Sequence, residues 1–153
     1  MKKLLLILLP FIVYTASAQI SFNTGNVQFD ADLNTINANA SVDFGAFKGK
    51  LLVSYDVSEK KIEFMKGSVN MAPGEIYLAL EISKLSKTPI DRVITIYERN
   101  KSKGWGCIAK EAGIKPGSPE FHQLKNNASS KKNKHKGKGK GKSKGKGKGN
   151  GKK

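Results

Sequence analysis

The stretch INANASVDF, residues 36–44, alternates without interruption between apolar and polar side chains. Successive side chains of an extended strand point to opposite faces. The pattern therefore predicts a strand with one face in a core and the other in water. Residues 27–33 alternate in the same way, with Val27, Phe29, Ala31 and Leu33 as the apolar set. We therefore expect residues 20–72 to form a β-rich half of the fold.

Two further apolar runs extend this β prediction. Residues 51–57 and 62–69 resume the alternation on either side of Ser58-Glu59-Lys60-Lys61, which predicts a β-hairpin. Acidic and Asn side chains occupy many of the polar positions in residues 27–44. They suit an antiparallel sheet with one face towards water.

Helical spacing of apolar residues begins after residue 72. Pro73 and Glu75 favour the first turn of a helix, because proline needs no backbone donor there and an acid complements the positive helix end. Thr88-Pro89-Ile90-Asp91 predicts the start of a second helix, with Thr88 as the capping residue.

A third helix is predicted from Trp105 to Ala112, followed by Gly113 as a left-handed cap. Ser118-Pro119-Glu120 then predicts the start of a last short helix. The predicted fold class is α+β: a small antiparallel β half, three to four short helices, then a disordered basic tail.

Residues 1–18 have the three parts of a secretory signal peptide. Lys2 and Lys3 are followed by an apolar run over residues 4–14 and by Ala16-Ser17-Ala18, a small-residue cleavage pattern. The apolar run is too short to span a membrane, which takes about 20 residues. We expect cleavage after Ala18, a secreted or periplasmic protein, and no transmembrane segment in the mature chain.

The basic charge is concentrated at the C-terminus. The full chain carries a formal charge of +16, whereas residues 19–125 hold 14 basic and 12 acidic side chains. Residues 126–153 hold twelve lysines and no acid, and they offer almost nothing apolar to bury. We therefore predict a single domain over 19–125, β-rich in 20–72 and helical in 73–125, and a disordered tail over 126–153 whose removal leaves the domain folded.

Mobile lysines bind polyanions by releasing counterions, with little selectivity. The predicted partners are lipopolysaccharide, acidic polysaccharide and extracellular nucleic acid. We expect a non-enzymatic polyanion- or envelope-binding module; the alternative is a structural protein whose domain binds an envelope protein while the tail assists. The predicted polyanion-binding residues are Lys131, Lys132, Lys134, Lys136, Lys138, Lys140, Lys142, Lys144, Lys146, Lys148, Lys152 and Lys153.

Catalytic and metal-ligating combinations are scarce. The histidines are His122 and His135, and the single cysteine, Cys107, lies in an apolar helical setting that favours packing over pairing with His122 as a nucleophile. We therefore predict no catalytic residue, metal or cofactor. Calcium binding by aspartates on the solvent faces of the predicted strands is the weaker alternative. These aspartates are Asp30, Asp32 and Asp43.

The segment from Lys103 to His122 contains Gly104-Trp105-Gly106-Cys107-Ile108-Ala109. It resembles a family of small uncharacterised secreted bacterial proteins of the Bacteroidetes type, with a Gly-Trp-Gly-x-Ile-Ala segment and a Lys/Gly-rich tail. The resemblance implies no activity and no functional residue. The pattern of residues 108–114 also resembles the first helix and turn of a DNA-binding helix-turn-helix domain. A helical hairpin packed in the core is favoured over this interpretation. In that hairpin Trp105 lies in the core, where its glycine neighbours allow backbones to approach closely.

Overall fold

The structure is a computed structural model and describes residues 20–134. The signal peptide predicted over residues 1–18 and the lysines from Lys136 onward lie outside the described residues. Within residues 20–134 the fold is entirely α-helical, with no strand. In chain order the helices are α1 Val27–Val42, α2 Phe44–Tyr55, α3 Glu59–Gly67, α4 Pro73–Ser86, α5 Ile90–Asn100, α6 Trp105–Glu111 and α7 Pro119–Asn133, with a 3-10 turn, η1, at Lys101–Lys103. The α+β prediction is therefore wrong.

The alternating stretch forms helix α1. The side chain of Asn26 accepts a hydrogen bond from the backbone N–H of Phe29 and caps the first turn. The buried residues of the apolar set are Phe29, Leu33, Ile36 and Ala40, at intervals of four, three and four. Positions four apart belong both to a two-residue repeat and to one side of a helix. The alternation therefore contained a helical stripe, and the other members of the set face water, among them Val42, 89% exposed.

The predicted β-hairpin is also wrong, because α2 and α3 replace its strands. Asp43 caps α2 by accepting from the backbone N–H of Ala46 at 2.9 Å. Asp56 ends α2 in a left-handed conformation, φ 48°. Ser58 then caps α3 by accepting from the backbone N–H of Lys61. The polar residues 58–61, expected to be a hairpin turn, are the first turn of a helix.

The helical half agrees with prediction in most respects. Helix α4 begins at Pro73 and α6 begins at Trp105, as predicted, whereas α5 begins at Ile90, one residue after the proline predicted for its first turn. Gly113 has φ +104°, and the backbone N–H of Ile114 donates to the carbonyl of Ala109 at 2.8 Å. The expected cap of α5 differs: the Thr88 hydroxyl donates to the carbonyl of Ala112 at 3.0 Å and thereby ties the α4–α5 turn to the end of α6.

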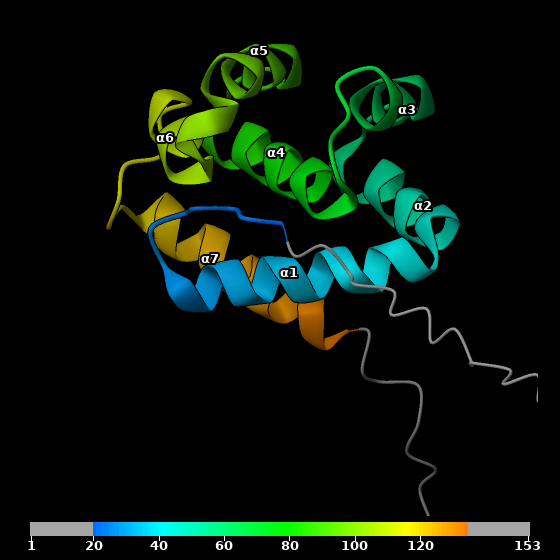
Figure 1. The fold of residues 1–153 in the computed structure, drawn as a ribbon, viewed down its shortest axis with the longest axis horizontal. Helices are drawn as coiled ribbons and strands as arrows, with labels where there is room; N and C mark the ends of the chain where they lie inside the picture. The colour runs from blue at the N-terminus through cyan, green and yellow to red at the C-terminus, as the bar shows by residue number, and fades with distance from the viewer. Residues whose placement is uncertain (1–19, 135–153) are drawn as a thin grey trace, which may run out of the picture.

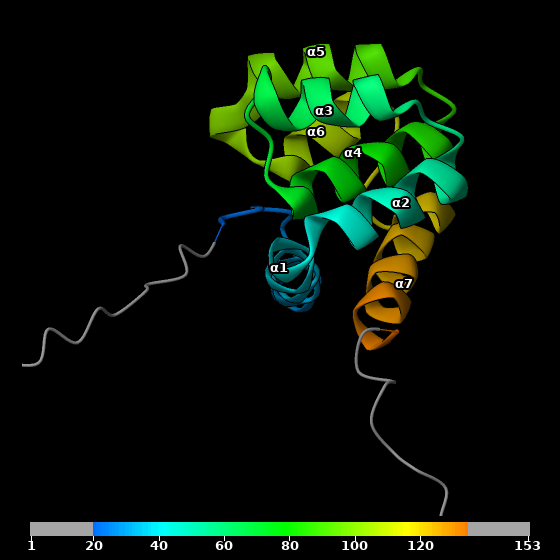
Figure 2. The same ribbon diagram turned by 90° about the vertical axis from the view of Figure 1, so that its right-hand side faces the viewer.

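Helix α4 is the centre of the molecule. Every residue from Gly74 to Ile82 is buried, and α4 contacts α1, α2, α3, α5 and α7. Figures 1 and 2 show α5 and α6 on one side of it and the pair α1 and α7 on the other. None of the described helices has the length and apolar character needed to cross a membrane.

Trp105 lies in the core, as predicted, with 2% of its surface exposed. Its indole N–H donates to the buried carboxylate of Glu75 at 3.3 Å, which also accepts from the hydroxyl of Tyr97. The N-terminal segment crosses directly over the flanking glycines. A Cβ on Gly106 would lie 2.9 Å from the carbonyl oxygen of Thr24, and one on Gly104 still closer to the segment. The predicted close approach of backbones is confirmed.

The C-terminal limit of the domain differs from the prediction. Helix α7 does not end near Lys125 but continues to Asn133, and Ala128 is fully buried. The polar composition of residues 126–133 predicted that they belong to the disordered tail. They form a helix because α7 lies along α1 and α4, as Figure 2 shows for α1 and α7 side by side. Residues up to 134 therefore belong with the domain.

Candidate functional site

The last two turns of α7 pack against three other helices. The side chain of Asn127 donates to the carboxylate of Glu81 on α4 at 2.9 Å. One turn later, the ammonium of Lys132 forms an ion pair with Asp32 on α1. These contacts explain why a lysine-rich segment is held on the domain, and they place its first lysines among residues from α1, α2 and α4.

Lys131 lies over two aromatic rings. Its Nζ atom is 5.6 Å from the ring centre of Phe47 on α2 and 5.5 Å from that of Tyr77 on α4. A cation over the face of an aromatic ring is attracted by the ring's electrons. Partial burial nevertheless lowers the pKa of Lys131, because the charged form loses hydration.

Glu81 is the buried acid beside this lysine. Its carboxylate accepts hydrogen bonds from the hydroxyl of Tyr55 and the side chain of Asn127. Its negative charge favours the charged form of Lys131 and thus opposes the lowered pKa. The hydroxyl of Tyr77 is also buried here, with no hydrogen-bond partner among the described residues. We call this group the α7 junction; its members are Phe47, Tyr55, Tyr77, Glu81, Asn127 and Lys131.

The twelve lysines predicted to bind polyanions divide into two groups. Lys131 and Lys132 are engaged with the folded domain, as described above, and Lys134 is exposed at the end of α7. The remaining nine begin at Lys136 and lie outside the described residues. The structure therefore separates lysines held on the domain from the alternating Lys/Gly series.

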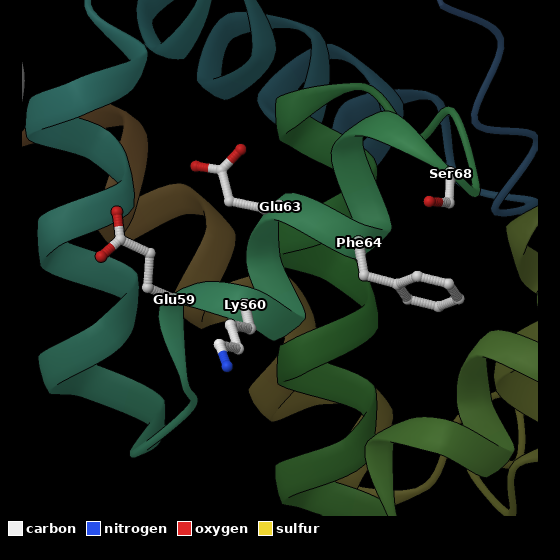
Figure 3. Close-up of a pocket in the computed structure, with 5 residues that line it drawn as sticks. All are labelled: Glu59, Lys60, Glu63, Phe64 and Ser68. Carbon is white, nitrogen blue, oxygen red and sulfur yellow. The ribbon is translucent and has the colours of Figure 1, made fainter.

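An open hollow lies on the surface of α3. It is lined by Glu59, Lys60, Glu63, Phe64 and Ser68. Figure 3 shows the two glutamates on one side of α3 and Phe64 pointing to the other, so the side chains do not converge. Both glutamates accept from Lys48 at 2.6 Å, which lowers the pKa of Glu63 and raises that of Lys48. The geometry is that of an ion pair that ties α2 to α3.

The residues considered for nucleophilic chemistry do not form a pair. Cys107 is half-buried on α6, and its thiol donates to the side-chain oxygen of Asn100 at 3.8 Å. His122 lies exposed on α7. Cys107 was predicted to pack in the core rather than pair with His122, and the structure leaves it partly exposed.

The aspartates considered as calcium ligands have separate structural tasks. Asp30 accepts from the backbone N–H of Thr24, and Asp32 pairs with Lys132. Asp43 caps α2. In residues 20–134, no group of three or more His, Cys, Asp or Glu side chains is arranged to hold a metal ion. The solvent-facing strands on which the calcium alternative depended do not exist.

Comparisons with protein-family models, with curated proteins and with solved structures found no match. The resemblance to a secreted bacterial family stays a prediction.

Sequence reasoning missed the aromatic and acidic members of the α7 junction. Phe47 lies far along the chain from Tyr77 and Glu81, and all three lie far from the lysines. One pattern does point to them: Tyr77 and Glu81 are four apart and therefore share a face of α4. That both face α7 follows only from the packing of the helices.

Proposed function

We propose that this protein is a secreted or periplasmic, non-enzymatic module that binds anionic polymers or envelope surfaces through its C-terminal lysines. The single observation that carries the proposal is the Lys/Gly series after residue 134, where nine lysines occur without an acidic residue. The predicted targets are lipopolysaccharide, acidic polysaccharide and extracellular nucleic acid.

The chemistry of the series defines the expected mode of binding. Lysine ammonium groups neutralise phosphate or sulfate groups and release the counterions condensed on them. The series has no arginine for bidentate contacts and no aromatic ring for base stacking. Binding should therefore follow charge density and show little preference for sequence.

The helical domain is the body that the series attaches to such a surface. Helix α7 connects the two directly, since it packs on α1 and α4 and ends where the series begins. Contacts of Asn127 and Lys132 hold the C-terminal turns of α7 on the domain.

A salt titration tests the proposal. The full chain, without residues 1–18, is titrated with a single-stranded oligonucleotide, heparin and lipopolysaccharide at increasing salt. With about five lysines in contact, the slope of log affinity against log salt should be near −3.5, from about 0.7 per phosphate of a single strand. A chain in which the nine lysines from Lys136 onward are replaced by glutamine should lose most of this slope. A slope near zero for the unaltered chain would reject the proposed function.

A second candidate is a protein-interaction role for the folded domain. Val42 and Val53 on the first two helices, which are 89% and 88% exposed, are the apolar residues that such a partner would contact. This role would be favoured by a protein partner that binds equally to the unaltered chain and to the chain whose lysines from Lys136 onward are glutamine. Binding of that partner should be lost on Val53→Lys.

A further inference from the structure

We infer that the polyanion contact continues from the Lys/Gly series onto the folded domain, across a surface formed by Lys50, Lys131 and Lys134. We call these three residues the junction lysines. The inference rests on the proposed function and deepens it, because it assigns part of the binding site to α2 and α7. Its ligand class is a polymer of phosphate or sulfate groups.

The first observation is that positive charge is gathered at this place. Lys50 is exposed on α2 and Lys134 is exposed at the end of α7. The ammonium of Lys131 lies 5.6 Å from the ring centre of Phe47 on α2, and Lys50 is three residues after Phe47 on the same helix, so the two lysines lie close together. Lys131 and Lys134 are three apart on one helix and therefore near neighbours.

The second observation is that nearby acids are already engaged. Among residues 20–134, no carboxylate lies within ion-pair distance of a junction lysine. Glu81 attracts the ammonium of Lys131 electrostatically but forms no ion pair with it. The carboxylate oxygens of Glu81 accept hydrogen bonds from Tyr55 and Asn127. On the α1 side, Asp32 is paired with Lys132. The junction lysines therefore repel one another, and a bound anion would supply the opposite charge that relieves the repulsion.

The third observation is continuity along the chain. From Lys134 to Lys148 a lysine occupies every second position. Lys134 is thus both the last residue of the described domain and the first of the alternating series. A polymer bound along the series reaches the junction lysines without a gap in positive charge.

The experiment measures salt slopes on the full chain with single-residue changes. Lys50→Gln and Lys134→Gln each remove one junction charge. Lys110→Gln is the matched control, because Lys110 is exposed on α6, which packs mainly on α5 and η1. With a single-stranded oligonucleotide as the probe, each junction change should reduce the slope by about 0.7 and the control should not. Circular dichroism confirms that all three variants are folded.

The same changes in the chain whose nine lysines from Lys136 onward are glutamine separate the two claims. Residual binding that disappears on Lys50→Gln supports the inference. If the unaltered chain binds but Lys50→Gln and Lys134→Gln behave like Lys110→Gln, the inference is overturned and the proposed function stands. If the unaltered chain shows no salt-dependent binding, the proposed function itself is rejected.

Discussion

The ammonium of Lys132, near the end of α7, forms an ion pair with Asp32 on α1, one hundred residues earlier in the chain. The carboxylate of Asp32 is almost fully buried and also accepts from the side chain of Gln28 at 2.8 Å. A buried charge that loses its partner destabilises a fold strongly. The last turns of α7 are therefore part of what holds the domain together.

A chain that ends at Lys125 should be less stable than one that ends at Lys134. The shorter chain loses the buried methyl group of Ala128 and the partner of Asp32. We expect a loss of about 3 kcal/mol or more in the free energy of unfolding. Urea unfolding of both chains, followed by circular dichroism, measures the difference. Equal midpoints would mean that residues 126–134 contribute nothing to folding.

Gly106→Ala should destabilise the domain, whereas Gly49→Ala should stabilise it. A Cβ at residue 106 meets the backbone of Thr24 at 2.9 Å, and relief of that contact costs about 1–3 kcal/mol. Gly49 lies in the interior of α2 with nothing within 4 Å of its added Cβ. Alanine there gains about 0.5–1 kcal/mol of helix stability. Thermal unfolding of both variants checks the opposite signs; shifts in the same direction would contradict the close approach.

Trp105→Phe should weaken the core but preserve the fold. Phenylalanine keeps the ring contact with Tyr97, now 5.2 Å between centres, but leaves Glu75 without the indole donor. Loss of a hydrogen bond to a buried carboxylate costs about 1–3 kcal/mol. The unaltered protein should show the blue-shifted emission of a buried indole. Emission typical of indole in water would contradict the burial on which this prediction depends.

Stability should fall in alkaline solution as the tyrosines of the unfolded chain ionise. Burial, followed by the charge of Glu81, raises the pKa of Tyr55 and of Tyr77 well above the ordinary value, and burial beside Glu75 does the same for Tyr97. Because each tyrosine has a higher pKa in the folded protein than in the unfolded chain, it favours the folded state at pH values below its pKa in the unfolded chain. That advantage declines above about pH 10, at up to about 1.4 kcal/mol per pH unit for each tyrosine. Tyrosinate absorbance should therefore appear together with unfolding. Ionisation of these tyrosines with helicity intact would contradict the prediction.

Lys131 should lose its proton at a lower pH than lysine in a model peptide, and Lys48 should lose its proton at a higher pH. Burial lowers the pKa of Lys131, and the charges of Lys50 and Lys134 lower it further. The bonds from Lys48 to Glu59 and Glu63 have the opposite effect. The effect of Lys131 on stability has the opposite sign to that of the tyrosines. Burial of its charged form destabilises the folded state, and this destabilisation is relieved as the pH rises above the pKa of Lys131 in the folded protein. NMR titration of lysine side chains, assigned with Lys131→Arg, measures the order.

Local features of the sequence determined where most helices begin and end. Pro73, the 118–120 pattern and Gly113 act through neighbouring backbone groups, so their effect could be predicted without knowledge of the fold. The burial of Trp105 was predictable for a similar reason, since adjacent glycines indicate a close backbone approach. The Lys/Gly series and its charge are also properties of the sequence by itself.

The tertiary structure decided whether the apolar residues of the first half form strands or helices. Phe29 and Leu33 fit one strand alternation and Ile36 and Ala40 fit another, whereas all four together fit a single helical stripe. The helical stripe is selected because α4 and α7 both pack on α1, so these four residues are buried together while Val42 stays in water. The tertiary structure likewise decided where the domain ends. Lys131 and Lys132 look like tail residues in sequence, but partners from α1, α2 and α4 hold them, because packing joins groups that the chain keeps far apart.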